Sequence, residues 1–302
     1  MKIYYADNFV LPLPPGHRFP MSKYSLLRQS VTEFENVSLE QAPEASLEEL
    51  LMAHDEDYVV RVINGQLTPS EQREIGFPWT PQMVERSRRS AGATIAACRT
   101  AWSEGVSANL AGGTHHAYAN KGSGFCVFND SAIAARASQK YLMPVLGRKA
   151  RVSIIDLDVH QGNGTASILN GDDSIFTLSV HGEKNFPFRK EKSDLDIGLA
   201  DGVGDDTYLY ALERAILEMT QRFDPELIIY LAGADPHEGD RLGRLALTFE
   251  GLKQRDLIVL DFAANNKIPL AITMAGGYGK RIEDTVQVHT QTIKTAIGYA
   301  WI

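Results

Sequence analysis

Residues Arg151 to Thr165 read RVSIIDLDVHQGNGT, and the rest of the chain is best understood in relation to them. They open with an apolar run of the kind that forms a buried strand. Polar groups then occupy every second position, at Asp156, Asp158 and His160. Because alternate residues of an extended chain point to the same side, we expect both carboxylates and the imidazole to leave the strand end together.

Such a group of polar side chains suggests a metal site. Buried carboxylates beside an imidazole are costly unless a positive charge sits among them. A divalent metal meets that need, and one His nitrogen with Asp oxygens suits zinc, and also iron, cobalt or manganese. The alternative is a polar strand end in which an Asp caps the next helix. A lone Asp-x-Asp-x-His pattern leaves both interpretations open, so the rest of the chain must decide.

The composition is that of an ordinary globular protein. The chain has 302 residues, of which 44% are hydrophobic and 23% charged, enough for one large α/β domain or two smaller ones. The formal net charge of -8 weighs against nucleic-acid binding. The two cysteines, Cys98 and Cys126, cannot build a disulfide framework or a cysteine-rich metal site.

Targeting and membrane signals are weak. The first seven residues are too polar for a signal peptide, and no run approaches the ~18 apolar residues of a membrane span. We therefore expect a cytoplasmic protein with no membrane partner.

Apolar strands alternate with helical patterns along the whole chain. Strands are predicted at residues 1–5, 107–111, 152–157, 175–180, 227–231 and 270–274. Helices are predicted at residues 21–31, 46–51, 59–63, 81–102, 131–140, 164–169, 207–223, 248–265 and 283–299. Residues 182–204 are charged and show little periodicity, which predicts a long surface loop. The pattern indicates an α/β fold with a mostly parallel sheet covered on both faces, and residues 1–302 as a single domain without a linker.

Polar residues follow several of these strands, and ligands of such folds bind beyond the carboxyl ends of the strands. Asp158, His160 and Asp235 can supply three metal ligands and leave a position open for water and substrate, as catalytic metals require. His115 and His116 form a tandem pair after two glycines. Although a lone histidine is usually structural, such a pair near a metal suits a general base and an electrostatic partner.

Tyr278 stands between glycines after the last predicted strand. Its hydroxyl can donate to a developing oxyanion where the backbone brings it close to a ligand. The alternative is a buried tyrosine whose hydroxyl is satisfied within the protein.

Taken in order, these motifs resemble the histone deacetylases and related zinc-dependent deacylases of the arginase–deacetylase superfamily. The similarity extends from His54 to Gly279 and looks most like the class IV branch and its bacterial relatives. It is carried by GTHHA at 113–117, GFCVFND at 124–130, DLDVHQGNG at 156–164, GAD at 233–235 and GGY at 276–278.

The resemblance implies the arginase–deacetylase fold, with a parallel sheet of about eight strands. It implies zinc held by Asp158, His160 and Asp235, and a catalytic pair in which His116 is the general base and His115 its partner. Tyr278 would polarise the scissile carbonyl. Asp156 and Asn163 would support the site from behind, and Gly124 and Phe125 would line the acyl-lysine channel. It also implies a potassium ion near the zinc, bound through Asp156, Asp158, His160, Ser179 and Val180.

Two positions depart from the family pattern. Asn163 stands where most class I relatives carry an Asp behind the second histidine. Residues 182–188 lack the aromatic-rich pattern that helps form the class I channel. Phe186 or Phe188 can take its place, and Phe186 is the residue we expect in the channel.

The sequence therefore predicts a zinc-dependent amide hydrolase that removes acetyl or longer acyl groups from N6-acyl-lysine in a protein or peptide. Ferrous iron would share the same ligands. Acetylpolyamines and other small acyl amides are alternative substrates. The alternative of another class is a non-catalytic acyl-lysine binding protein, in which the pocket is kept and turnover is lost.

Overall fold

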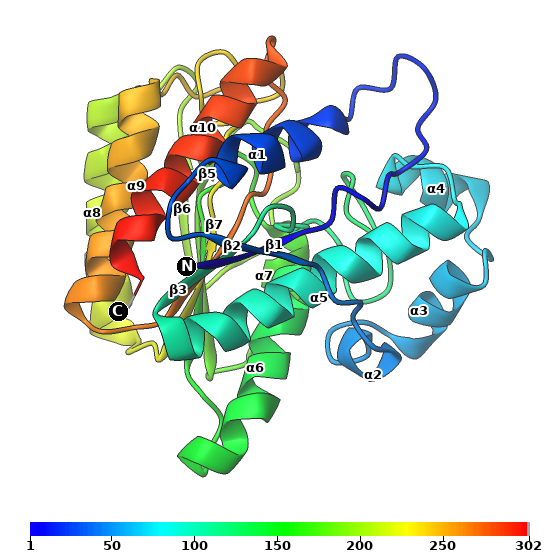
Figure 1. Ribbon diagram of the computed structural model, residues 1–302, viewed down its shortest axis with the longest axis horizontal. Helices are drawn as coiled ribbons and strands as arrows, with labels where there is room; N and C mark the ends of the chain where they lie inside the picture. The colour runs from blue at the N-terminus through cyan, green and yellow to red at the C-terminus, as the bar shows by residue number, and fades with distance from the viewer. Residues whose placement is uncertain (301–302) are drawn as a thin grey trace.

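The computed structural model describes residues 1–300 and contains a parallel sheet of eight strands in the order β2-β1-β3-β8-β7-β4-β5-β6 (Figure 1). The strands are β1 (Lys2–Tyr5), β2 (Ser38–Gln41), β3 (Val106–Asn109), β4 (Val152–Asp156), β5 (Ile175–Gly182), β6 (Leu195–Leu199), β7 (Leu227–Leu231) and β8 (Leu270–Thr273). The predicted parallel α/β fold is therefore confirmed.

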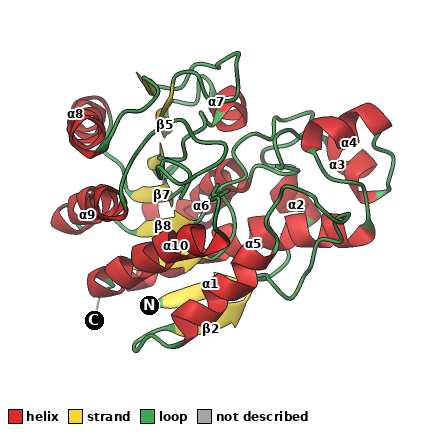
Figure 2. Ribbon diagram, turned by 90° about the horizontal axis from the view of Figure 1, so that it is seen from above, coloured by secondary structure: helices red, strands yellow, loops and turns green. Residues whose placement is uncertain are grey.

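Helices cover both faces of this sheet. They are α1 (Ser22–Thr32), α2 (Leu47–Leu50), α3 (Glu56–Ile63), α4 (Pro69–Ile75), α5 (Pro81–Glu104), α6 (Asp130–Leu146), α7 (Asn163–Leu169), α8 (Asp205–Arg222), α9 (Phe249–Asn265), α10 (Ile282–Ala296) and a short 3₁₀ helix (Ile297–Tyr299). Figure 2 shows α8 and α9 on one side of the strands and α6 and α7 on the other. Among residues 1–300, none of these helices has the length and apolar character that a bilayer crossing demands.

The central strands are apolar throughout because each contributes to two cores. Ile154 of β4 packs with α5 and α6, whereas Ile155, the next residue, packs with α8, α9 and α10. Ile229 and Tyr230 of β7 divide in the same way. Burial on both faces therefore explains why these strands lack the alternation of polar and apolar residues seen in half-exposed sheets.

The strand register brings the ends of β3, β8, β7 and β4 into one row, beside Ser179 within β5. Asp156 of β4 pairs with Ser179 of β5 and with Leu231 of β7. Leu231 pairs in turn with Thr273 of β8, which pairs with Asn109 of β3. The segments that follow β3, β8, β7 and β4 consequently leave the sheet at the same edge, where most of the predicted site residues lie, while β5 continues to Gly182.

The prediction of a continuous loop over residues 182–204 is wrong. Strand β5 extends to Gly182, and β6 pairs with it as an edge strand. An edge strand pairs with only one neighbour and buries only part of one face. Its short, charged sequence therefore carries little apolar signal. The exposed edge strand β2 was missed for the same reason. Helix α4 was also missed, although Thr68 and Glu71 form a capping box at its start.

Candidate functional site

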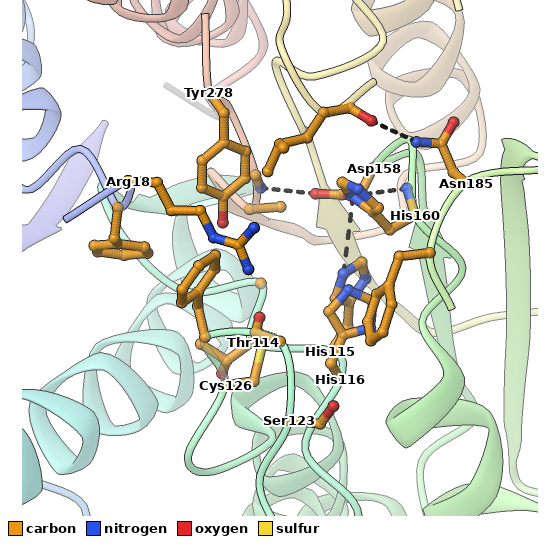
Figure 3. A pocket seen from close by; sticks show the side chains of 18 of the residues that line it. Arg18, Thr114, His115, His116, Ser123, Cys126, Asp158, His160, Asn185 and Tyr278 are labelled. Carbon is orange, nitrogen blue, oxygen red and sulfur yellow. Dashed lines mark hydrogen bonds and ion pairs between the residues drawn. The ribbon is translucent and has the colours of Figure 1, made fainter. Parts of the chain in front are cut away.

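A cavity of about 620 Å³ opens at the carboxyl edge of the sheet, beyond β3, β8, β7 and β4 (Figure 3). The residues predicted for catalysis, metal binding and the channel that line it are His115, His116, Gly124, Phe125, Asp158, His160, Phe186 and Tyr278. Asp235 is fully buried behind Asp158 and His160. The structure thus brings together residues that lie far apart in the chain, such as His115 and Tyr278.

The predicted metal ligands Asp158, His160 and Asp235, which we call the ligand cluster, offer donor atoms that all lie within 4.8 Å of one another. The Nδ1 atom of His160 is 2.9 Å from Asp158 Oδ1 and 3.3 Å from Asp235 Oδ2. Backbone N–H groups fix both carboxylates: Gly276 donates to Asp158 Oδ2 at 2.7 Å, and Val159 donates to Asp235 Oδ1 at 2.9 Å. Within residues 1–300, the buried Asp235 Oδ2 accepts no hydrogen bond, as suits an oxygen that binds a metal.

The charges of the ligand cluster also fit a cation. Burial opposes a charge on His160, but Asp158 and Asp235 outweigh it and raise the pKa of the imidazole to about 10. Burial and the neighbouring charge of Asp158 raise the pKa of Asp235 to about 6. The cluster therefore attracts positive charge. A side chain at Gly276 would collide with the carboxylates of Asp158 and Asp235, so glycine leaves that space open. A divalent metal fits these donors, as the sequence predicts.

The two adjacent histidines are held by different partners. Asp156 Oδ2 lies 2.6 Å from Nδ1 of His115, and Asn163 Oδ1 lies 2.7 Å from Nδ1 of His116. The amide nitrogen of Asn163 donates to the Tyr118 hydroxyl at 2.8 Å, which directs its oxygen toward His116. His116 Nδ1 must therefore carry the hydrogen, because Asn163 Oδ1 can only accept. Its Nε2 atom is left as the proton acceptor.

These partners give the two imidazoles opposite charge preferences. Burial, together with the charges of His115 and His160, lowers the pKa of His116 well below the usual range. Burial acts the same way on His115, but Asp156 and Asp158 outweigh it and raise the pKa of His115 to about 9. A neutral His116 can accept a proton and a charged His115 can act as an electrostatic partner, and these two roles stay predictions.

The loop that carries both histidines is anchored by residues whose role was not foreseen. Asp130, fully buried at the start of α6, accepts hydrogen bonds from the backbone N–H of Gly113 at 3.0 Å and of Thr114 at 2.7 Å. The side chain of Asn129 donates to the Ala117 carbonyl at 3.1 Å and accepts from Ala132 N–H as the helix cap. The motif GFCVFND contained this signal, because Asn and Asp are favoured helix-cap residues.

Tyr278 is held through its backbone. Its N–H donates to Asp240 Oδ2 at 2.6 Å, and its carbonyl accepts from Arg241 Nε at 2.9 Å. Burial raises the pKa of the Tyr278 hydroxyl well above the usual range, so the hydroxyl keeps its proton and remains a hydrogen-bond donor. Its ring lies 5.9 Å from that of Phe125, centroid to centroid.

Aromatic side chains form the approach to the ligand cluster. Phe186 packs edge-on against His116, with ring centroids 4.9 Å apart, and Phe188 stands at the mouth with 85% of its surface exposed. Gly124 has a φ of +54°, and a Cβ there would lie 2.7 Å from the His116 ring. Only glycine fits this position, so the GFC motif is explained by close packing against the catalytic histidine candidate.

The residues predicted for potassium also gather in one place. Asp156 and Ser179 are neighbours in the register of β4 and β5, and Val180 follows Ser179. The Ser179 hydroxyl lies 2.9 Å from Nδ1 of His181. Their role in binding potassium stays a prediction.

Arg18, Lys23 and Tyr24 also line the cavity and were not foreseen. Arg18 belongs to a Pro-rich segment that is irregular but ordered, because His17 Nε2 lies 2.9 Å from the Gly76 carbonyl and Phe19 packs edge-on against Phe77. Arg18, Lys23 and Tyr24 meet cavity residues from distant parts of the chain, and local sequence patterns do not reveal such contacts.

Comparison with known proteins agrees with this geometry. The histone deacetylase domain family matches residues 17–293. The chain is 43% identical to an uncharacterized protein of Picosynechococcus sp. over 95% of both chains. It is 32% identical to histone deacetylase 2 of Arabidopsis thaliana, over 87% of this chain and 70% of that protein. The crystal structure of a histone deacetylase homologue complexed with SAHA superposes with a TM-score of 0.82 at 25% identity, covering 98% of this chain and 83% of that one.

Proposed function

Because this chain belongs to the histone deacetylase family, we propose that it is a metal-dependent amide hydrolase that removes acyl groups from N6-acyl-lysine. The observation that carries the proposal is the ligand cluster of Asp158, His160 and Asp235, in which a buried carboxylate oxygen accepts no hydrogen bond within residues 1–300. This cluster lies at a cavity that also contains a histidine pair and a tyrosine hydroxyl. Placement in the class IV branch stays a prediction.

Asp158, His160 and Asp235 would hold the metal, which is zinc by preference, although ferrous iron suits the same donors. When bound, the metal supplies Lewis acidity that polarises the acyl carbonyl and acidifies the attacking water. Asp156, Asp158, His160, Ser179 and Val180 would bind potassium beside it. A positive charge there would offset part of the negative charge of the buried carboxylates.

The side chains of the cavity supply the proton transfers. Nε2 of His116 takes a proton from the attacking water while Asn163 holds Nδ1, 2.7 Å away. The Tyr278 hydroxyl donates to the carbonyl oxygen as negative charge develops on it. A protonated histidine then gives a proton to the amine nitrogen as the C–N bond breaks. Asp156, 2.6 Å from His115, stabilises positive charge on that ring.

Gly124, Phe125 and Phe186 would form the channel for the acylated side chain, because aromatic walls suit its apolar methylenes. Four basic residues also line the cavity: Arg18, Lys23, Lys184 and Arg244. Such a lining disfavours acetylpolyamines, which are themselves polycations. The complete set of histidines, carboxylates and tyrosine argues against a non-catalytic binding protein.

The test is an assay of the zinc-loaded protein on a peptide that carries one acetyl-lysine, followed by mass spectrometry. We expect the peptide to lose the acetyl mass, which leaves an unmodified lysine in the intact peptide and releases acetate. A matched peptide with an ordinary lysine controls for proteolysis. Stoichiometric binding of the acylated peptide without turnover would favour the non-catalytic alternative instead.

A further inference from the structure

Lys23 is an unusual residue for the inner wall of this cavity. It lies in the first turn of α1, is only 2% exposed and lines the cavity beside Tyr24. Its Nζ donates to the Ala275 carbonyl at 3.2 Å and lies over the rings of Tyr24 and Tyr278, at 5.2 and 5.6 Å from their centroids. Within residues 1–300, no carboxylate pairs with it, although an ammonium has three hydrogens to donate.

A buried ammonium without a counter-charge is costly, and such groups normally pair with an anion. One carbonyl and two aromatic faces meet only part of this need. Because Lys23 lines a cavity and is not enclosed by the core, the missing partner can come from a ligand.

The position of Lys23 indicates which part of the substrate it meets. Ala275, which accepts its hydrogen bond, precedes Gly276, whose N–H donates to the metal-ligand candidate Asp158 at 2.7 Å. Lys184 and Phe188 are exposed and mark the mouth, whereas Lys23 and Gly113 are buried at the inner end. A lysine of a protein must enter from the mouth, so the acyl chain points inward, toward Lys23.

We propose that the preferred acyl group carries a terminal carboxylate, as succinyl and glutaryl groups do, and that Lys23 binds that carboxylate. The inference rests on the proposed function and specifies its substrate class. The reaction needs only water: its oxygen bonds to the acyl carbon, the C–N bond breaks, and the amine leaves with a proton. The products are a free amine and a dicarboxylate.

The charges around the rest of the cavity favour the same ligand. Of its four basic residues, Arg244 pairs with Asp201 at 3.1 Å, while Arg18 reaches toward Tyr278 (Figure 3). Apart from Asp158 of the ligand cluster, which would bind the metal, the acidic residue of the lining is Glu74, and it is paired with Lys121 at 2.6 Å. The lining is therefore cationic in a protein whose net charge is -8, which attracts anionic substrates.

The experiment measures kcat/KM of the full-length, zinc-loaded enzyme on peptides identical except for one acetyl-, butyryl-, succinyl- or glutaryl-lysine. Butyryl and succinyl have equal chain length and differ in the carboxylate. We expect a succinyl-to-butyryl ratio of roughly ten to a hundred, the effect of one charge-assisted hydrogen bond. Lys23→Gln should bring the ratio near one, and Lys23→Arg should retain most of it. Lys184→Gln, which removes a charge at the mouth, should change the ratio less than twofold.

Each result decides the proposal. A wild-type preference for butyryl or acetyl would overturn it and leave the amide hydrolase intact, whereas cleavage of none of the four peptides would overturn both. If Lys23→Gln lowers kcat/KM equally on the succinyl and the butyryl peptide, Lys23 does not bind the carboxylate and only positions the Tyr278 loop. Should the variants fail to fold, inhibition of wild-type enzyme gives a second test. Free succinate should then compete at least tenfold better than butyrate, and equal inhibition would contradict the assignment.

Discussion

Two buried polar clusters lie close to each other in this protein and differ in how completely they are satisfied. The ligand cluster combines two carboxylates with one imidazole and leaves Asp235 Oδ2 without a hydrogen bond within residues 1–300. The second, which we call the helix cluster, consists of Tyr230, Arg255, Asp256 and Thr292.

In the helix cluster every charge has a partner inside the protein. Arg255 donates to Asp256 Oδ1 at 2.8 Å, Tyr230 donates to the same oxygen at 2.5 Å, and Thr292 donates to Asp256 Oδ2 at 2.6 Å. One positive charge balances one negative charge. Both clusters are buried, so burial alone does not mark a functional site. Unbalanced charge, free lone pairs and an adjoining cavity do.

This comparison predicts that the ligand cluster serves activity and the helix cluster serves stability. Asp158→Ala should lower kcat/KM by more than roughly 10³ and abolish metal binding, because it removes one of three ligands and its charge. Elemental analysis and the acyl-lysine assay measure both effects. Asp158→Asn, which keeps the shape, is the matched control for folding, and a metal-replete, active Asp158→Ala protein would remove Asp158 from the site.

The helix cluster should respond in the opposite way. Asp256→Ala leaves Arg255 buried without its partner, which should lower the free energy of unfolding by about 3–5 kcal/mol. Urea denaturation followed by circular dichroism measures the change. Metal content and turnover of the folded fraction should stay near wild type. If the variant unfolds at the wild-type urea concentration, the two clusters do not differ as we claim.

A substitution at Tyr278 tests whether residues of the cavity serve activity and not stability. Tyr278→Phe keeps the ring and the backbone bonds to Asp240 and Arg241 but removes the hydroxyl. We expect turnover to fall by roughly 10²–10³, the usual loss for one oxyanion donor, with metal content and melting temperature unchanged. Near-normal turnover would show that the hydroxyl does not face the scissile carbonyl.

The smallest change in activity that we predict is that of Asn163→Asp. His116 acts as a base when neutral, so kcat/KM should fall as the pH drops through its pKa. Burial and the charges of His115 and His160 lower that pKa in the wild type. Asn163→Asp adds a negative charge beside Nδ1, which favours the imidazolium and should move the acidic limb upward by roughly one pH unit. A limb that stays in place would separate residue 163 from the titrating base.

The sequence was sufficient to predict that the residues of the ligand cluster and the histidine pair lie together. Asp158 and His160 follow an apolar strand with a period of two, and the strands carry them, with Asp235, to one edge of a parallel sheet. Asn163 was also expected behind His116, and the two lie 2.7 Å apart. These positions depend on strand register, which leaves a periodic signal in the sequence.

The cationic inner wall left no such signal. Lys23 meets Ala275 across 252 positions of sequence, through an irregular segment and one helix turn. Edge strand β6 was hidden for a related reason, because it buries only part of one face. Interactions that depend on the course of loops can be identified only in the three-dimensional structure, whereas those at the ends of buried strands can be predicted from the sequence.

The most direct test of the account is metal reconstitution. The protein is stripped with a chelator, and kcat/KM on an acetyl- or succinyl-lysine peptide is followed as zinc is added in steps. We predict negligible activity in the stripped protein and a linear rise that levels off at about one equivalent per chain, as expected for a single three-ligand site. Full activity in stripped protein with no bound metal would contradict the central claim.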